Sequence, residues 1–327
     1  MTTAVRHSRS TRRVAMLATS PGDMVWIRGR QFLMGSDAHY PEEGPVREVD
    51  VGGFWLDRDP VTNASFAAFV EETGYVTVAE EPNDASRYPG GIREMLRPGS
   101  LVFVKPQGPV SVRSSAAWWR YIIGANWRHP EGPRSSIYGR EHHPVVHVAY
   151  RDAVAFAAWA GKTLPTEAEW ELACRGGIEG APFAWGNELT PGGVCMANYW
   201  QGRFTQENLR IDGYEGTSPV GAFPANGYGV RDMIGNVWEW TTDWFVPRDV
   251  HASTPCCVPR NPRGGFERLS SDPSVPAIHT PRKVLKGGSF LCAANHCQRY
   301  RPAARHAQPI DTGTSHVGFR CAARPVE

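Results

Sequence analysis

The 327-residue sequence lacks any long run of apolar residues. A helix that crosses a bilayer needs about 20 of them in succession, so we expect no membrane partner. It also lacks an excess of one charge, because 35 Lys and Arg stand against 33 Asp and Glu, scattered along the chain. Proteins that follow the phosphates of nucleic acid usually carry a basic stripe. Nucleic acid is therefore not an expected partner either.

The first 22 residues are basic and are predicted to form a flexible leader, ahead of a single domain at residues 23–327. Their apolar stretch, VAMLA, is shorter than the roughly 7 to 15 residues of a signal-peptide core. An arginine pair precedes it, but the hydrophobic segment that follows a twin-arginine signal is missing. We therefore expect a cytoplasmic protein. No internal repeat and no linker-like change of composition divides the rest.

Cysteines are few and irregularly spaced, so they form no dense disulfide framework. In a large reduced protein a cysteine serves as a small apolar residue unless its surroundings indicate otherwise. We expect most of them to be reduced thiols. The seven are Cys174, Cys195, Cys256, Cys257, Cys292, Cys297 and Cys321.

Glycine (34), proline (27) and tryptophan (12) are abundant. This composition predicts a loop-rich fold with short elements packed around aromatic anchors. Alternating apolar and polar residues predict a strand hairpin at 24–36, with its turn near Arg28 to Arg30, and a second strand pair at 45–62. Residues 76–139 lose periodicity and are interpreted as an ordered insertion. Caps and periodicity predict helices at 63–74, 149–161 and 166–176, and late strands at 284–290 and 317–324.

Three histidines, His142, His143 and His147, have the look of a metal-ligand set. A proline and two valines separate them, and these residues disfavour the helix that would align the rings. We therefore predict that the rings splay apart and have structural roles.

Two stretches are rich in oxygen ligands. Asn198 and Asp212 stand beside glycine and aromatic residues, and Asp232 and Glu239 lie on either side of a Gly-Asn turn. Calcium takes several carboxylate and carbonyl oxygens, although the spacing is not that of an EF-hand. Capping of turns is the commoner role for such residues, so both interpretations stay open.

Cys292 and Cys297 stand five residues apart behind a glycine pair. On a helix, five steps of about 100° would leave their side chains about 140° apart, so they can cooperate only from a loop. Three roles stay open: a disulfide, a soft-metal site, or two unrelated core thiols. Two thiolates are too few for tetrahedral zinc, whereas copper(I) accepts few soft ligands.

The neighbours of this pair bear on its chemistry. Gly287 and Gly288 lack a Cβ atom, so another backbone, such as that of a peptide substrate, could approach closely. Arg299, Arg301 and Arg305 would favour the thiolate form if their side chains point inward.

Five segments together carry a recognisable pattern: GANWRHPEG, LPTEAEWE, PANGYGVRDMIGNVWEW, LKGGSFLCAANHCQRYRPAAR and GFRCAAR. They resemble the formylglycine-generating enzyme family, the sulfatase-modifying factors, from about Met24 to the C-terminus. The specific part is the Cys-x4-Cys after Gly-Gly-Ser. The resemblance implies an α+β fold, the family's loop-rich variant of the C-type-lectin-like fold, with little regular secondary structure.

The resemblance also implies an activity. Such enzymes use molecular oxygen (O2) to oxidise the cysteine of a C-x-P-x-R motif, in an unfolded or nascent sulfatase polypeptide, to Cα-formylglycine. Cys292 and Cys297 would bind Cu(I), and Ser289 and Trp238 match the active-site serine and tryptophan of the family. We expect a monomer, and Trp118, Trp119 and Arg128 are candidates for contacts with the peptide.

Structural calcium (Ca2+) is the remaining implication. The family binds it through two sets of oxygen ligands, and the matching positions here all supply oxygen, so we expect calcium in at least one set. The first set is Asn198, Tyr199 (carbonyl), Asp212 and Tyr214 (carbonyl); the second is Asp232, Gly235 (carbonyl), Val237 (carbonyl) and Glu239.

The sequence departs from the eukaryotic relatives, which are secretory and carry structural disulfides. Ala157 and Pro302 stand where two of those cysteines would be, which leaves Cys174 and Cys321 without partners. This is typical of a bacterial, cytoplasmic branch. The adjacent Cys256 and Cys257 have no predicted role.

A rival interpretation is a non-catalytic binding paralogue of the same superfamily, in which the two thiols are incidental. A mononuclear-iron sulfoxide synthase would carry a helical domain with clustered histidines ahead of Met24, and the residues there show no such pattern. A thiol-disulfide oxidoreductase usually carries C-x-x-C at a helix start, and this motif is absent.

Overall fold

The computed structural model describes residues 23–87, 92–112, 114–247 and 257–325. The predicted leader, residues 1–22, and Cys256 lie outside the described residues. Within these ranges the protein has three α-helices and eleven short strands in four small sheets, joined by long loops. The predicted loop-rich α+β architecture is confirmed. No helix in the described part is long and apolar enough to cross a membrane.

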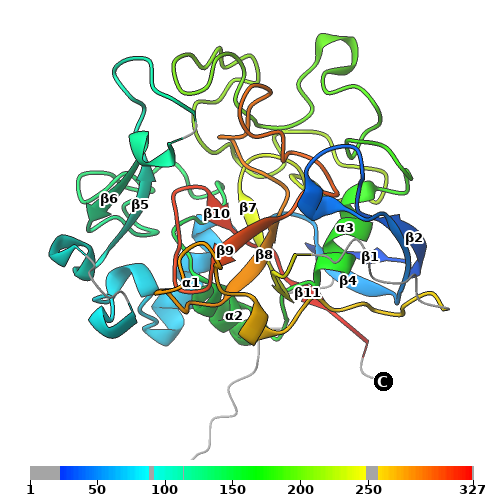
Figure 1. The fold of residues 1–327 in the computed structure, drawn as a ribbon, viewed down its shortest axis with the longest axis horizontal. Coiled ribbons are helices and arrows are strands. Elements are labelled where there is room, and N and C mark those ends of the chain that lie inside the picture. Colours follow the sequence, from blue (N-terminus) through cyan, green and yellow to red (C-terminus); the bar gives the residue numbers. More distant parts are fainter. Residues whose placement is uncertain (1–22, 88–91, 113, 248–256, 326–327) are drawn as a thin grey trace, which may run out of the picture.

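The four-stranded sheet β10-β7-β8-β9 lies at the centre of the molecule (Figure 1). The β5–β6 hairpin lies on one side of it, and α3 with the strands β1, β2 and β4 lies on the other. The helices are α1 (Asn63–Thr73), α2 (Tyr150–Trp159) and α3 (Glu167–Arg175). The strands are β1 (Met24–Ile27), β2 (Arg30–Met34), β3 (Arg47–Val51), β4 (Phe54–Asp57), β5 (Gly99–Phe103), β6 (Trp119–Ile123), β7 (Trp238–Trp244), β8 (Arg282–Lys286), β9 (His306–Pro309), β10 (Val317–Gly318) and β11 (Ala322–Ala323). Short 3-10 helices span Pro41–Glu43, Val78–Glu80, Ala85–Arg87, Arg93–Leu96, Ser115–Ala117, Pro191–Gly193 and Glu267–Leu269.

The predicted pairing of the first strands is wrong. β1 pairs with β4 and β2 pairs with β3, all antiparallel, so residues 24–34 and 47–57 form one long hairpin. The expected turn near Arg28 to Arg30 is only a bend, where a Cβ atom on Gly29 would lie 2.5 Å from the Gly53 nitrogen. Alternating polarity identifies strands but does not choose between these partners, because each pairing buries the same face.

The helix boundaries follow their caps. In α1 the Thr62 side chain accepts a hydrogen bond from the Ser65 nitrogen, and the chain leaves the helix at Gly74 with a left-handed φ of 67°. In α3 the Thr166 and Glu169 side chains each accept a hydrogen bond from the other residue's backbone nitrogen, at 3.1 and 2.7 Å. This capping box confirms the predicted start of α3.

The insertion at residues 76–139 contains the β5–β6 hairpin, which periodicity did not reveal. Leu101 of β5 forms a bridge to Thr314, and the Ser100 hydroxyl donates to the Gly313 carbonyl at 2.8 Å. The insertion is therefore held against the segment that leads into β10.

Strand β8 ends at Lys286 and leads into the Gly287-Gly288 pair. Both glycines have left-handed φ angles, 95° and 74°, which other residues rarely adopt. A Cβ atom on Gly287 would lie 2.9 Å from the Met233 carbonyl oxygen, and one on Gly288 would lie 2.9 Å from that of Arg299. The backbone that approaches these glycines thus belongs to the protein itself, not to a substrate as the sequence suggested.

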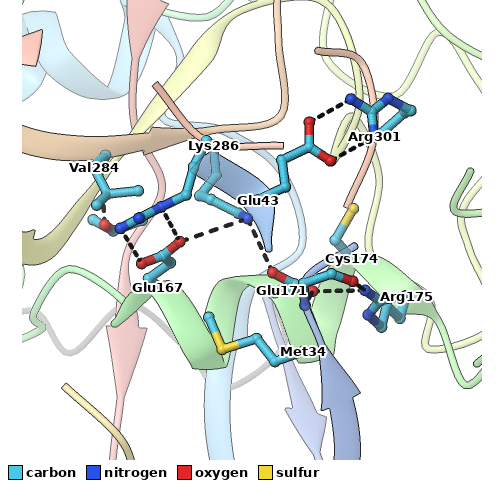
Figure 2. A network of polar contacts seen from close by, with 12 residues as sticks. Met34, Glu43, Glu167, Glu171, Cys174, Arg175, Val284, Lys286 and Arg301 are labelled. Atoms are coloured by element: carbon cyan, nitrogen blue, oxygen red, sulfur yellow. Dashed lines mark hydrogen bonds and ion pairs between the residues drawn. The ribbon is translucent and has the colours of Figure 1, made fainter. Parts of the chain in front are cut away.

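Buried ion pairs join α3 to both ends of the loop that follows β8 (Figure 2). The Lys286 ammonium lies 3.1 Å from a Glu171 carboxylate oxygen and 4.0 Å from one of Glu167. Glu167 also pairs with Arg305 at 2.9 Å, and Glu171 with Arg175 at 2.7 Å. One helix therefore supplies the counterions for Lys286, which directly precedes this loop, and for Arg305, the last residue of the loop.

A second buried pair fixes the loop from another direction. Arg301 forms a two-point pair with Glu43, with Nη1 2.6 Å from Oε2 and Nη2 against Oε1 (Figure 2). The exposed fractions of the two side chains are 3% and 0%. The Arg301 Nε also donates to the Gln298 carbonyl at 2.7 Å. Residues 287–305 are thus clamped by α3 and by Glu43.

The buried Glu43–Arg301 pair should contribute far more to stability than an exposed ion pair does. We expect Glu43→Gln to lower the free energy of unfolding by about 3 to 5 kcal/mol, because it leaves the Arg301 charge buried without a counterion. The matched control is Glu131→Gln, which removes the exposed pair with Arg140. We expect this change to lower the free energy of unfolding by about 0 to 1 kcal/mol. Urea unfolding measures both. Equal losses would contradict the clamp.

Candidate active site

Cys292 and Cys297 lie in the loop between β8 and β9, outside any helix, which is the condition under which their spacing allows them to cooperate. The Cys292 nitrogen donates to the Ser289 carbonyl at 2.9 Å, and the Cys297 nitrogen donates to the Ala293 carbonyl at 3.0 Å. Two successive turns thereby bring the sulfurs to 3.3 Å from each other. Ala293 also forms a backbone bridge with Trp200.

The two thiols have different electrostatic surroundings. Burial raises the pKa of Cys292, and so does its hydrogen bond with Cys297. The hydrogen bond from the Cys292 thiol lowers the pKa of Cys297, with a further contribution from Arg299, whose Nη1 lies 3.9 Å from the Cys297 sulfur. The arrangement favours a thiolate at Cys297 and a thiol at Cys292.

Of the three arginines considered from the sequence, Arg299 is the one that points toward the thiolate. Its guanidinium lies 3.9 Å from the centre of the Tyr40 ring, and its Nη2 donates to Glu42 at 2.5 Å. Arg301 and Arg305 instead serve in the clamp. Tyr40 and Glu42 are about 260 positions away in the sequence and carry no motif, so they could not be identified from the sequence.

Ser289 and Trp238 occupy different parts of the same region. Ser289 is fully buried, its backbone nitrogen faces the Cys292 sulfur at 3.4 Å, and its hydroxyl accepts from the Leu291 nitrogen at 3.2 Å. Trp238, on β7, stacks on His306 with ring centres 5.4 Å apart. Both cysteines pack in the same apolar cluster as Trp238.

A cavity of about 440 Å³ lies between the β5–β6 hairpin and residues 306–316. His306, the residue against Trp238, and His316 both line it. The Trp118-Trp119 dipeptide connects it to the cysteine loop, because Trp118 packs against His296 at 5.4 Å and Trp119 against His316 at 4.8 Å. Residues of the cysteine loop and of the cavity wall therefore pack against the same dipeptide.

The other candidates named from the sequence, Arg128 and the histidines, make contacts that stabilise the fold. Arg128 stacks on Trp127 at 4.2 Å and pairs with Glu80 at 2.7 Å. His147 is buried between the Ser100 hydroxyl and the Pro130 carbonyl, 2.8 Å from each. His143 contacts Thr217 instead, so the histidines are splayed. Among the described residues, no group of three or more His, Cys, Asp or Glu side chains could hold a metal ion.

In the first predicted calcium set, oxygen atoms converge around a nitrogen. The Gln201 Nε2 donates to the Asp212 carboxylate at 2.7 Å and also to the Tyr199 carbonyl. Asp212 further accepts from the backbone nitrogens of Tyr199 and Tyr214, at 3.2 and 3.0 Å, and burial raises its pKa. Asn198 donates its amide to the Gly216 carbonyl. The Gln201 amide nitrogen, which carries a partial positive charge, thus contacts two of the predicted ligands, and these oxygens would also suit a cation.

The second set fits a cation less well. Glu239 accepts from Arg320 through both carboxylate oxygens, at 2.7 and 2.8 Å, and from Trp170 at 2.7 Å. The buried guanidinium thus neutralises this carboxylate. Asp232 accepts from the Gly221 nitrogen at 2.6 Å, and burial raises the pKa of Asp232 to about 6. Gly235 and Val237 lie between them, but Arg320 supplies the positive charge that calcium would bring.

The chain was compared with known proteins. The family model described as "Sulfatase-modifying factor enzyme 1-like domain" matches residues 11–325. A Mycobacterium tuberculosis protein named "Formylglycine-generating enzyme" is 53% identical over 306 residues, which cover 93% of this chain and 98% of the relative. A Bos taurus protein named "Inactive C-alpha-formylglycine-generating enzyme 2" is 37% identical over 309 residues, covering 92% of this chain and 87% of the relative.

A solved structure supports the fold. PvdO from Pseudomonas aeruginosa superposes with a TM-score of 0.57 at 24% identity, covering 92% of this chain and 94% of PvdO. At that identity the likeness concerns the fold alone, and it confirms the predicted variant of the C-type-lectin-like fold. The family match spans residues 11–325, which include the clamped loop and its paired thiols. The alignment with the 53% identical relative covers 93% of the chain. The chain belongs to the sulfatase-modifying factor family, which includes the formylglycine-generating enzymes.

Proposed function

We propose that the protein is a formylglycine-generating oxidase. It converts the cysteine of a C-x-P-x-R motif, in an unfolded or nascent sulfatase polypeptide, to Cα-formylglycine with molecular oxygen as the acceptor. The observation that carries the proposal is the pair of sulfurs, 3.3 Å apart, in a loop clamped at both ends. The relative named "Formylglycine-generating enzyme", 53% identical over almost its whole length, supports it.

The donor set of the loop suits a soft metal. Cys292 and Cys297 would hold Cu(I), because thiolates select this ion and two of them satisfy its low coordination number. When bound there, the copper would supply the activation of oxygen. Cys297 already favours its thiolate form, so binding would require loss of a proton mainly from the Cys292 sulfur.

The protein's own residues hold the reacting groups in place. Ser289 fixes the Cys292 sulfur through its backbone nitrogen, and Arg299 stabilises the negative charge on Cys297. Apolar packing around Cys292, which is 2% exposed, keeps water from that thiol, whereas Cys297 is partly exposed. The cavity beside Trp119 would receive the residues that follow the substrate cysteine. The chain therefore contributes mainly position and a dry environment.

A non-catalytic binding paralogue is the alternative within the family, which includes a relative named inactive. In such a protein the thiols would be ordinary core residues. The depressed pKa of Cys297 and the guanidinium beside it favour the catalytic role, because a structural thiol needs neither.

The first calcium set is part of the proposal as a structural site. Asp212, with the Tyr199 carbonyl, would bind Ca²⁺ after the Gln201 amide turns aside, and Asn198 and Tyr214 would add oxygen ligands. The ion would order the long loop that precedes β7.

Activity tests the oxidase most directly. A peptide containing C-T-P-S-R, incubated with the protein, Cu(I), a reductant and air, should gain an aldehyde that reacts with a hydrazide, as detected by mass spectrometry. Cys292→Ser and Cys297→Ser should each abolish this product, because either change removes one of two soft ligands. The exposed Cys257→Ser is the control and should retain full activity. Copper uptake by the wild type without aldehyde formation would contradict the proposed function.

The thiolate assignment predicts a pH profile. Iodoacetamide should label Cys297 before Cys292 in the metal-free protein, with a midpoint below the ordinary pKa of a cysteine. Arg299→Gln should raise that midpoint by roughly one pH unit or more, because a positive charge next to a thiolate lowers its pKa. Peptide mapping by mass spectrometry follows the label. Arg140→Gln, in an exposed pair, is the control and should leave the midpoint unchanged; faster labelling of Cys292 would overturn the assignment.

Calcium should stabilise the fold. Adding Ca²⁺ to chelator-treated protein should raise the melting temperature, with a gain of about 3 kcal/mol at a hundredfold excess over the dissociation constant. Asp212→Asn should remove the effect. Asp232→Asn should retain it, because Arg320 already neutralises the Glu239 carboxylate of the second set. Differential scanning calorimetry measures both variants. An unchanged melting temperature in the wild type would exclude the first set as a calcium site.

A further inference from the structure

A second cavity, of about 380 Å³, lies between the N-terminal half of α1, the C-terminal end of α2 and the residues that follow β4. It shares no lining residue with the cavity beside Trp119. Ala68, Phe156 and Trp159 give it apolar surface, and the rings of Phe156 and Trp159 pack with their centres 5.4 Å apart. A concave site of this size, with apolar walls and a few polar groups, suits a small organic ligand.

The polar part of the lining contains two ion pairs that neutralise themselves. The Lys162 ammonium lies 2.5 Å from the Asp57 carboxylate, and both side chains are largely buried. The Arg231 Nε donates to the Asp59 carboxylate at 2.8 Å. These four side chains therefore leave no net charge for a ligand to balance.

Two further charged side chains of the lining, Asp23 and Arg58, have no hydrogen bond, ion pair or ring contact within the part of the chain that the structure describes. The Arg58 backbone nitrogen donates to the Asp23 carbonyl at 3.0 Å, which continues the β1–β4 ladder by one pair beyond Met24 and Asp57. Directly opposite residues on paired strands have Cβ atoms about 5 Å apart. The cavity thus presents one carboxylate and one guanidinium next to each other.

We propose that this cavity binds a free α-amino acid with an apolar side chain. Arg58 binds the α-carboxylate through two parallel hydrogen bonds, Asp23 accepts from the α-ammonium group, and the ligand's side chain lies against Trp159 and Phe156. A residue inside a peptide carries neither charge, and a chain end carries only one, so the adjacent pair selects the free amino acid. The inference goes beyond the proposed oxidase and does not depend on it.

The backbone around Arg58 is fixed before any ligand binds. The buried Arg320 guanidinium donates to the carbonyls of Asp57, Arg58 and Arg231, at 3.2, 3.0 and 2.8 Å. The same guanidinium pairs with Glu239 on β7. Binding therefore requires the ordering of side chains but little change of the backbone, which conserves affinity.

A comparison of three ligands tests the charge requirement. L-Phenylalanine carries both charges, hydrocinnamate lacks the ammonium group, and phenethylamine lacks the carboxylate. Ligand-observed NMR titrations of the full chain measure the three dissociation constants. We expect L-phenylalanine to bind about tenfold more tightly than either other compound, because each of those loses one charge-assisted contact.

Variants assign each contact. Arg58→Gln should weaken binding of L-phenylalanine about tenfold and change that of phenethylamine less than twofold. Asp23→Asn should weaken L-phenylalanine about tenfold and change hydrocinnamate less than twofold. Ala68→Trp should fill the cavity and remove binding of all three compounds. Arg28→Gln is the matched control, because Arg28 is an exposed arginine that directly follows β1 but does not line the cavity.

Several results would overturn the amino-acid site. These are no binding of L-phenylalanine, equal affinities for the three compounds, equal effects of Arg28→Gln and Arg58→Gln, or binding that persists in Ala68→Trp. Conversion of C-T-P-S-R by the wild type, measured in parallel without the amino acid, reports on the oxidase alone, so either proposal can fail while the other stands. Melting curves check that the variants are folded.

Discussion

The buried ion pairs around residues 287–305 are the constraint on which the site depends. Lys286 and Arg305 meet the carboxylates of α3, and Arg301 meets Glu43 from the hairpin region. Charges taken out of water are tolerated only when each finds its partner, so few arrangements of this loop satisfy all of them at once. The loop has no regular secondary structure of its own, and these pairs replace the ladder of hydrogen bonds that a helix or strand would supply.

Within that frame the chemistry follows from short-range contacts. Two turns bring Cys292 and Cys297 together, and Arg299, held by Glu42 and Tyr40, biases one of them toward the thiolate. Residues 40–43 therefore supply both Glu43, the counterion of Arg301, and the two residues that orient Arg299. Stability and reactivity are coupled here, because displacement of residues 40–43 would disturb both.

The features that depend on local sequence could be predicted, whereas those that depend on contacts between distant residues could not. Thr62 and Thr166 determine where helices begin through local hydrogen bonds, and helix geometry showed that the two cysteines can cooperate only from a loop. Strand partners and buried counterions depend on contacts between distant residues, so the β1–β4 pairing, the Glu43 partner of Arg301 and the Arg320 partner of Glu239 were not predictable from local pattern. The glycine pair was recognised, but the backbone that approaches it is internal.

The central claim is that the clamped loop presents two sulfurs to one soft metal ion. X-ray absorption at the copper edge, on the full chain loaded with one equivalent of Cu(I) under reducing conditions, tests it most directly. The account predicts one tightly bound ion with a coordination shell made of sulfur alone, and loss of that shell when Cys292 and Cys297 are both replaced by serine. A shell of nitrogen or oxygen ligands, or an unchanged spectrum in the double variant, would contradict it.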